Sequence, residues 1–117
     1  MSDIKRLHPT PRMHQAVIHS GLVYTAGQVA QNNPGASVAT QTAEVLKRID
    51  DLLAEAGSHK GRILSANLYL ADMADFDEMN SVWDAWIDQD GKPARTTVQA
   101  LLTEPQFTIE IGVIAAI

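Results

Sequence analysis

The sequence contains no cysteine, which excludes disulfide bonds, thiol nucleophiles and cysteine-ligated metal sites. Positive charge is also scarce, because 9 Lys and Arg residues stand against 14 Asp and Glu residues, for a formal net charge of -5. The basic residues form no run, so a nucleic-acid partner is not expected. No apolar run could span a membrane, and the segment before Leu7 lacks the apolar core of a signal peptide. We therefore expect a cytoplasmic protein with no membrane or nucleic-acid partner.

The length of 117 residues predicts a single domain over residues 1–117. Hydrophobic residues make up 45% of the chain and charged residues 20%, which is typical of a globular protein. No internal repeat, linker or low-complexity segment divides the sequence. The elements predicted below are therefore expected to share one core.

The first part of the chain is predicted to form short strands followed by a loop. A Ser20-Gly21 turn between two runs of β-prone residues indicates a hairpin. The loop is expected at 32–35, where Asn, Pro and Gly residues gather. The expected strands are Ile4 to His8, Gln15 to His19 and Leu22 to Val29.

The clearest predicted element is a helix from Val38 to Ala56, because its apolar residues recur at steps of three and four. Ser37 is the expected N-cap, and Gly57 stands where a left-handed residue commonly follows a helix. The opposite face of this helix, which includes Glu44 and Arg48, is expected to be solvated. The pattern predicts a helix that covers one face of a sheet.

The second part of the chain is predicted to continue with strand, helix, strand and strand. In the first of these strands, 63–70, Leu64 is expected to share a face with the other apolar residues. Asp75 and Glu78 have the spacing of a capping box at the start of a helix that Gly91 ends. The two remaining strands are expected at Arg95 to Leu102 and Phe107 to Ile117.

This order of elements predicts an α+β fold with both helices on one face of the sheet. The other face is expected to be semi-polar, because Tyr69, Arg95, Thr97 and Glu110 are assigned to it. A semi-polar sheet face often meets another subunit, so the pattern also favours an oligomer.

The histidines are not expected to form a metal site. His14 and His19 are an odd number of residues apart, so in a regular strand they face opposite sides. No helix carries a pair of histidines at a four-residue step. The sequence also lacks a Gly-x-Ser-x-Gly elbow and a Gly-rich phosphate loop.

Two charged residues stand in otherwise apolar strands, Arg95 and Glu110. A buried charge must be paired or used, and the simplest interpretation is that the two side chains pair with each other or with surface partners. The alternative is catalytic. The planar fork of Arg95 suits a substrate carboxylate, and Glu110 could hold and polarise a water molecule. The residues alone leave both interpretations open.

Several short motifs, in order along nearly the whole chain, resemble the RidA/YjgF family. Pro93 followed by Ala94-Arg95 resembles its Pro-Ala-Arg signature, and Ile109-Glu110-Ile111 resembles its C-terminal strand. The segments around Asn80 and Arg95 are especially similar to a YoaB-like branch of the family. The other matching landmarks are Gln15-Ala16-Val17, Thr25-Ala26-Gly27-Gln28-Val29, Gln41-Thr42, Ala56-Gly57 and Asp75-Phe76 with Asn80.

The resemblance implies a chorismate-mutase-like fold, in which three subunits form a barrel with ligand sites between neighbours. It also implies hydrolysis of enamines and imines such as 2-aminoacrylate to a 2-keto acid and ammonia, without cofactor or metal. Transferred to this sequence, Arg95 binds the carboxylate of the 2-imino acid and Glu110 positions the attacking water. Gly27, Thr97 and Asn80 are the expected supporting residues of the substrate site.

The sequence departs from the family pattern at positions that the resemblance assigns to the site. Met13 stands where the deaminases usually carry a tyrosine, and Tyr24 or His14 is the candidate to replace its hydroxyl. Ala26 and Thr97 replace a serine and a cysteine of the family. A second hypothesis is therefore a non-catalytic trimer that binds small carboxylates or 2-keto acids. A third, an activity on RNA, fits poorly with the net charge of -5.

Overall fold

A computed structural model describes residues 3–117 and contains one six-stranded sheet with the strand order β1-β2-β3-β6-β4-β5. Only the pair of β4 and β5 is parallel, and the other neighbours are antiparallel. Three strands precede the first helix, so the segment for which the sequence left the choice between two and three strands open, Ile4 to His8, does form a strand. The elements are β1 (Lys5–Pro9), β2 (His14–His19), β3 (Leu22–Thr25), α1 (Val38–Glu55), β4 (Ile63–Leu70), α2 (Phe76–Trp86), β5 (Ala94–Gln99) and β6 (Ile109–Ala116), with short 3-10 turns η1 (Lys60–Arg62) and η2 (Met73–Asp75).

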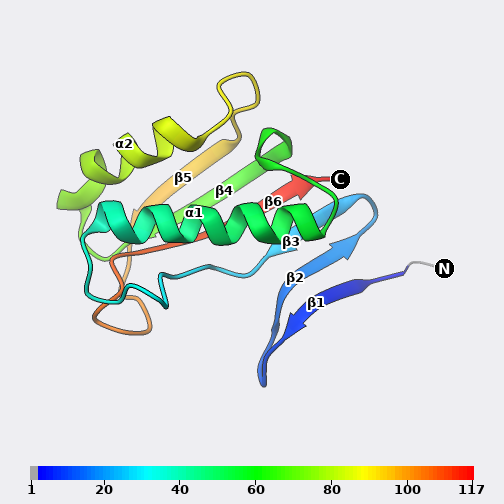
Figure 1. The fold of residues 1–117 in the computed structure, drawn as a ribbon, viewed down its shortest axis with the longest axis horizontal. Coiled ribbons are helices and arrows are strands. Elements are labelled where there is room, and N and C mark those ends of the chain that lie inside the picture. Colours follow the sequence, from blue (N-terminus) through cyan, green and yellow to red (C-terminus); the bar gives the residue numbers. More distant parts are fainter. Residues whose placement is uncertain (1–2) are drawn as a thin grey trace.

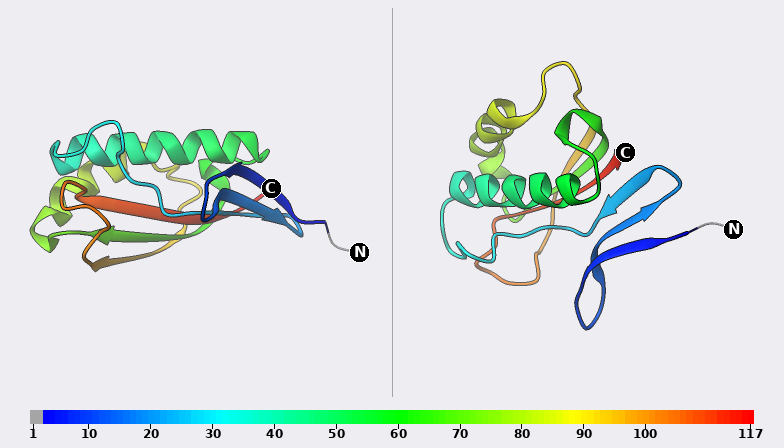
Figure 2. Two further views of the ribbon diagram at one scale, coloured as in Figure 1. Left: turned by 90° about the horizontal axis from the view of Figure 1, so that it is seen from below. Right: turned by 45° about the vertical axis from the view of Figure 1, so that its right-hand side comes forward.

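Both helices lie on one face of the sheet, which confirms the predicted α+β arrangement (Figures 1 and 2). The core fills the space between the helices and this face, with Leu46, Ile49 and Leu53 of α1 fully buried. The indole Nε1 of Trp86 donates a hydrogen bond of 3.0 Å to Asp50, which ties α2 to α1. The opposite sheet face is left uncovered by any element of the described chain.

The predicted start of helix α1 at Val38 is confirmed, and the helix ends at Glu55, one residue before the predicted Ala56. The hydroxyl of Ser37 accepts a hydrogen bond from the backbone N–H of Thr40, and Gly57 has a φ of 84°. The capping box predicted for α2 is wrong, because Asp75 makes no capping hydrogen bond. Glu78 instead accepts a hydrogen bond of 3.2 Å from the backbone N–H of Ala39, at the start of α1.

Helix α2 ends at Trp86, earlier than the end predicted at Gly91. The backbone is already extended at Ile87, and Gly91 lies in the loop that leads to β5. Strands β5 and β6 are shorter than predicted because the segment from residue 100 to 108 forms a loop. Leu101, which the alternation had assigned to a strand, is fully exposed in this loop.

A bulge at the start of β4 overturns the prediction for Leu64. The pairing with β6 shifts between Ile63 and Ser65, so Ile63 rather than Leu64 is buried beside Ala66. The side chain of Leu64 is 51% exposed. One extra residue in a strand reverses the faces of the residues before it, which simple alternation cannot anticipate.

Strand β3 also departs from the prediction, because it ends at Thr25 rather than at Val29. Tyr24 pairs with Ile114, but the next pair along the chain is an isolated bridge between Gln28 and Ile111. One more residue therefore stands on the β3 side than on the β6 side. At this irregularity, the hydroxyl of Thr25 accepts a hydrogen bond from the backbone N–H of Val113. The interruption brings Gly27 beside β6 without regular strand pairing.

No helix in residues 3–117 is both long enough and apolar enough to cross a membrane.

Candidate functional site

Glu110 projects from β6 toward the uncovered face of the sheet. Its neighbours in the strand, Ile109 and Ile111, are fully buried on the helix-covered face. The carboxylate lies against Gly27, where a Cβ atom would overlap the Glu110 Oε2 atom. The interrupted strand and the absent side chain at position 27 together make room for this carboxylate.

The carboxylate of Glu110 is half-buried and forms no hydrogen bond or ion pair within residues 3–117. Burial raises the pKa of Glu110 above the ordinary glutamate value, since the charged form loses hydration and gains no partner. A free carboxylate with a raised pKa can accept and return a proton closer to neutral pH. The interpretation in which Glu110 pairs with Arg95 is therefore wrong for the described chain.

Two hollows meet at Glu110 and Gly27. One, of about 290 Å³, opens on the uncovered sheet face and includes Tyr24. The other, of about 320 Å³, lies at the margin of the sheet and includes Met13. Three of the predicted substrate residues, Gly27, Tyr24 and Met13, thus lie around Glu110. His14 lines neither of these hollows.

Arg95 lies on the opposite side of the sheet from Glu110, which corrects the prediction that the two share a face. The register pairs Arg95 with Ala66, a buried residue of the helix-covered face. The guanidinium carbon of Arg95 lies 5.2 Å from the ring centre of Trp83 and 5.9 Å from that of Phe76. Stacking on two aromatic rings fixes the guanidinium while its N–H edges remain available.

Asn80 and Thr97 accompany Arg95. Asn80 and Arg95 line a hollow of about 310 Å³ beside α2. Thr97 was also predicted on the uncovered face, but it pairs with buried Leu68 and lies with Arg95 on the helix-covered face of β5. The Asn80 Oδ1 and Thr97 Oγ1 atoms are buried and have no hydrogen-bond partner. Unpartnered buried polar atoms are uncommon because each costs free energy, and Asn80 belongs to the hollow that Arg95 also lines, where a polar ligand can satisfy such an atom.

The predicted site residues therefore form two groups within one chain. Met13, Tyr24 and Gly27 surround Glu110, whereas Asn80 and Thr97 accompany Arg95. Glu110 and Gly27 line two hollows, and Arg95 and Asn80 line a third. None of these three hollows contains both Arg95 and Glu110.

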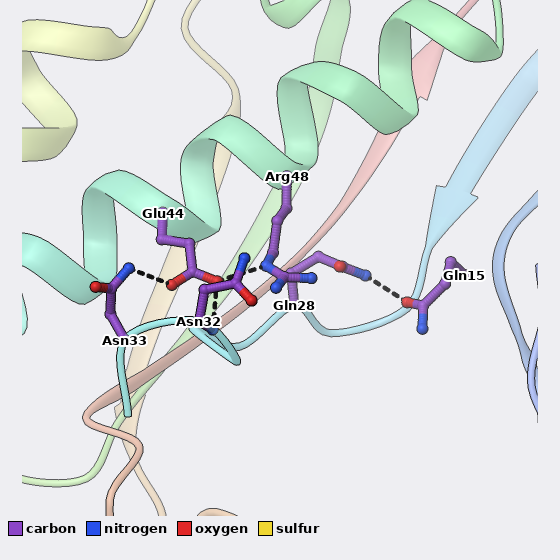
Figure 3. Close-up of polar contacts among 6 residues, drawn as sticks. All are labelled: Gln15, Gln28, Asn32, Asn33, Glu44 and Arg48. Atoms are coloured by element: carbon purple, nitrogen blue, oxygen red, sulfur yellow. Dashed lines mark hydrogen bonds and ion pairs between the residues drawn. The ribbon is translucent and has the colours of Figure 1, made fainter. Parts of the chain in front are cut away.

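The hollow beside Met13 also contains residues that the sequence did not identify as part of a site. Its polar lining includes Gln15, Gln28 and Arg48. Gln28 is buried, and its Nε2 donates a hydrogen bond to Gln15 (Figure 3). The same nitrogen donates to the carbonyl of Ala26. The family landmarks included Gln15 and Gln28, but nothing in the sequence placed Arg48 beside them.

The prediction that this face of α1 is solvated is confirmed for Lys47, Asp51 and Glu55, which are exposed, but it is wrong for Glu44 and Arg48. The Arg48 and Glu44 side chains are only 28% and 11% exposed, because the loop at 32–33 covers them. Burial by itself would raise the pKa of Glu44. Hydrogen bonds from the Asn32 N–H, the Asn33 amide and Arg48 Nε outweigh that effect and lower this pKa (Figure 3).

Within residues 3–117, no three His, Asp or Glu side chains gather closely enough to hold a metal ion.

His8, which has a positive φ of 54°, contacts Glu55 through Nε2 at 2.7 Å.

The chain is similar to known proteins in both sequence and structure. The family model described as endoribonuclease L-PSP matches residues 3–117. A RutC family protein of Haemophilus influenzae is 44% identical over 112 residues, which cover 96% of this chain and 97% of the relative. The RutC family protein YoaB of Escherichia coli K12 is 40% identical over 114 residues, covering 97% and 98% of the two chains. The crystal structure of a YjgF family member from Neisseria meningitidis has a TM-score of 0.94 and 46% identity, covering 97% of this chain and 94% of that one.

Proposed function

This chain belongs to the YjgF/RidA family, and from that premise we propose that it hydrolyses reactive 2-imino acids and their enamine tautomers to 2-keto acids and ammonia. The observation that carries the proposal is the carboxylate of Glu110. It has no partner within residues 3–117, its pKa is raised by burial, and it faces two hollows. These are the properties of a group that exchanges protons with a bound water.

The reaction needs an anchor for the substrate and a proton acceptor. Arg95 binds the carboxylate of the 2-imino acid through its N–H fork, with the guanidinium held by Trp83. Glu110 takes a proton from water as the water oxygen bonds to C2 of the protonated imine, and the electron pair of the C=N bond moves to nitrogen. The resulting amino alcohol collapses when Glu110 returns this proton to nitrogen, the C–N bond breaks and ammonia leaves. The hydroxyl proton passes to Glu110 as the C2=O bond forms, and Glu110 then releases it to solvent. One water is consumed, and the 2-keto acid remains.

Such a substrate is already reactive, so positioning supplies much of the required rate. Correct orientation of reactants contributes on the order of 7–11 kcal/mol in the best intramolecular systems. The unpartnered Asn80 Oδ1 and Thr97 Oγ1 atoms support a polar ligand beside Arg95. Backbone groups at Gly27 and Thr97 would complete the orientation of the ligand.

The site is proposed to lie between subunits of a homotrimer. Arg95 and Glu110 line different hollows of one chain, so a neighbouring copy must bring its Glu110 group to the Arg95 group. The uncovered sheet face, which includes exposed Tyr24 and Val98, is the surface proposed to meet that copy. A closed cyclic arrangement repeats the same contact and gives one site for each interface.

Binding without turnover is the alternative function, and one observation favours it. Met13, with a thioether instead of a phenol, lines the hollow beside Glu110. Tyr24 lines the adjoining hollow and is the proposed replacement for the missing hydroxyl. A binding protein would use Arg95 but would not depend on Glu110.

The description of the family model mentions an endoribonuclease, but the charge of this chain argues against RNA as its substrate. The chain carries a formal net charge of -5. The hollow beside Met13 contains one cationic side chain, Arg48, and the hollow beside Asn80 contains two, Arg95 and Lys92. RNA binding depends on several phosphate contacts.

A coupled assay tests the proposal. A pyridoxal-phosphate dehydratase supplies 2-aminoacrylate, and pyruvate release is followed with wild type, Arg95→Ala and Glu110→Gln. The proposal expects wild type to exceed the spontaneous rate and both variants to fall to it. If the wild type matches the spontaneous rate but binds pyruvate, the binding function takes its place. An unchanged rate in Glu110→Gln would contradict the assigned proton transfer.

A further inference from the structure

The hollow at the margin of the sheet has opposite charges on its lining. Glu110 belongs to one side, and Arg48 reaches in from helix α1. The neutral lining is largely polar, with amides from Gln15 and Gln28. A hollow of about 320 Å³ with this lining fits a small polar side chain better than an apolar one.

Arg48 is held so that part of its guanidinium remains free. Its Nε donates a 2.8 Å hydrogen bond to Glu44, and Glu44 is itself fixed by Asn32 and Asn33. Figure 3 shows Arg48 extending from α1 toward Gln28, with Nε on the side of Glu44. The two Nη groups form no hydrogen bond within residues 3–117. Four N–H donors of the fork therefore remain for a ligand.

The other acidic residues near Arg48 do not use these donors. Asp51 and Glu55 line a neighbouring hollow with Arg48, but Asp51 pairs with Lys47 and Glu55 pairs with His8. Gln28 donates to Gln15 and to the carbonyl of Ala26, which fixes both amides. The amide nitrogen of Gln15 donates no hydrogen bond within the described residues and offers a further donor beside Arg48.

We propose that this hollow receives the substrate side chain and that Arg48 selects 2-imino acids with a second, distal carboxylate. The inference rests on the proposed function, because Glu110 marks the reacting end of the same hollow. The substrate class is the imino dicarboxylates, such as the imine formed by oxidation of glutamate. Met13, which is 48% exposed at this hollow, contacts the methylene groups between the two ends of the ligand.

The first test is binding of the keto acid products, which does not require turnover. Calorimetry compares 2-oxoglutarate with pyruvate on wild type, Arg48→Gln and Lys47→Gln. Wild type is expected to bind 2-oxoglutarate roughly tenfold more tightly, the effect of one charge-assisted contact, and Arg48→Gln to lose that preference. Lys47→Gln removes one charge from the exposed side of the same helix and should keep the preference for 2-oxoglutarate. Equal affinities in the wild type, or an unchanged preference in Arg48→Gln, would overturn the inference.

The second test compares turnover of the imines that an amino-acid oxidase forms from glutamate and alanine. Arg48→Gln is expected to lower the ratio of kcat/KM for the two imines by roughly tenfold. A parallel loss for both imines would assign Arg48 a structural role and overturn the inference. If wild type hydrolyses neither imine but still prefers 2-oxoglutarate through Arg48, the proposed function fails while the carboxylate site stands.

Discussion

Arg95 and Glu110 project from opposite faces of one sheet, because Arg95 pairs with buried Ala66 in β4 and Glu110 pairs with Tyr69 of the same strand. Side chains three residues apart in a strand point in opposite directions. A single chain therefore divides the two groups that the proposed hydrolysis must combine. This relationship makes the dependence of activity on association between subunits directly testable.

Mixed oligomers of Arg95→Ala and Glu110→Gln should regain activity that neither variant has alone. If each site takes Arg95 from one subunit and Glu110 from its neighbour, random trimers from equal amounts restore about a quarter of the sites. The variants are unfolded and refolded together, and imine hydrolysis is measured against each variant refolded alone. Absence of any recovery in verified mixed trimers would mean that both groups act from the same chain.

Local signals accounted for much of the fold. Ser37 and Gly57 delimit α1 because N-capping and left-handed geometry depend on neighbouring residues. Features that depend on distant pairing were missed. Leu64 turned outward at a bulge defined by β6, and Glu78 bonded to Ala39 of another helix. A sequence pattern contains neither relationship.

The candidate site was predictable as a set of residues but not as an arrangement. Arg95 and Glu110 were recognisable as charges in strands and from the family motifs. The face of Arg95 was not predictable, because the more apolar positions of the edge strand β5, such as exposed Val98, face the uncovered side and the polar Arg95 faces the helices. Arg48 was assigned to solvent because the loop that covers it, at 32–33, is adjacent only in space.

The raised pKa of Glu110 predicts a particular pH dependence. Activity requires the ionised carboxylate as base, so kcat/KM should fall with decreasing pH at a value above the ordinary glutamate pKa. The pH–rate profile of wild type measures this limb, and any residual activity of Glu110→Gln should lack it. A wild-type limb at or below the ordinary glutamate value would contradict the assignment.

The same pKa shift gives a second, independent readout in stability. The folded state favours protonated Glu110, so the wild type loses stability as pH rises through the raised pKa. Glu110→Gln lacks this loss. Its Tm relative to wild type should therefore increase between acidic and neutral pH, measured at one protein concentration because the oligomer can contribute. A constant difference in Tm across that range would count against the shift.

Gly27→Ala should reduce activity through Glu110. A Cβ atom at position 27 would overlap the Glu110 carboxylate, which is the flexible end of a side chain and can move aside. The expected result is a fall in kcat/KM of at least roughly tenfold with little change in stability, since small displacements of catalytic groups are costly. Gly21→Ala is not a suitable control because Gly21 has a φ of 78°. Ala26→Gly is the better control, because it changes the backbone freedom of the adjoining position without adding an atom next to the Glu110 carboxylate.

Glu44→Gln should destabilise the fold, whereas Asp51→Asn on the same helix should not. Each carboxylate pairs with a basic residue four positions away in α1, Glu44 with Arg48 and Asp51 with Lys47. The Glu44 side chain is 11% exposed, whereas that of Asp51 is 60% exposed. Glu44 also holds the loop at 32–33, so its loss is expected to cost about 1–3 kcal/mol, against less than about 1 kcal/mol for the exposed pair.

The pH dependence of this difference identifies its electrostatic part. The pKa of Glu44 is lowered in the folded state, so its stabilisation is present above the unfolded pKa and disappears as pH falls through the folded one. Urea unfolding at neutral pH should therefore separate wild type from Glu44→Gln, and the two curves should converge at a pH below the ordinary glutamate range. If the separation persists there, packing of the side chain rather than its charge holds the loop and Arg48 in place.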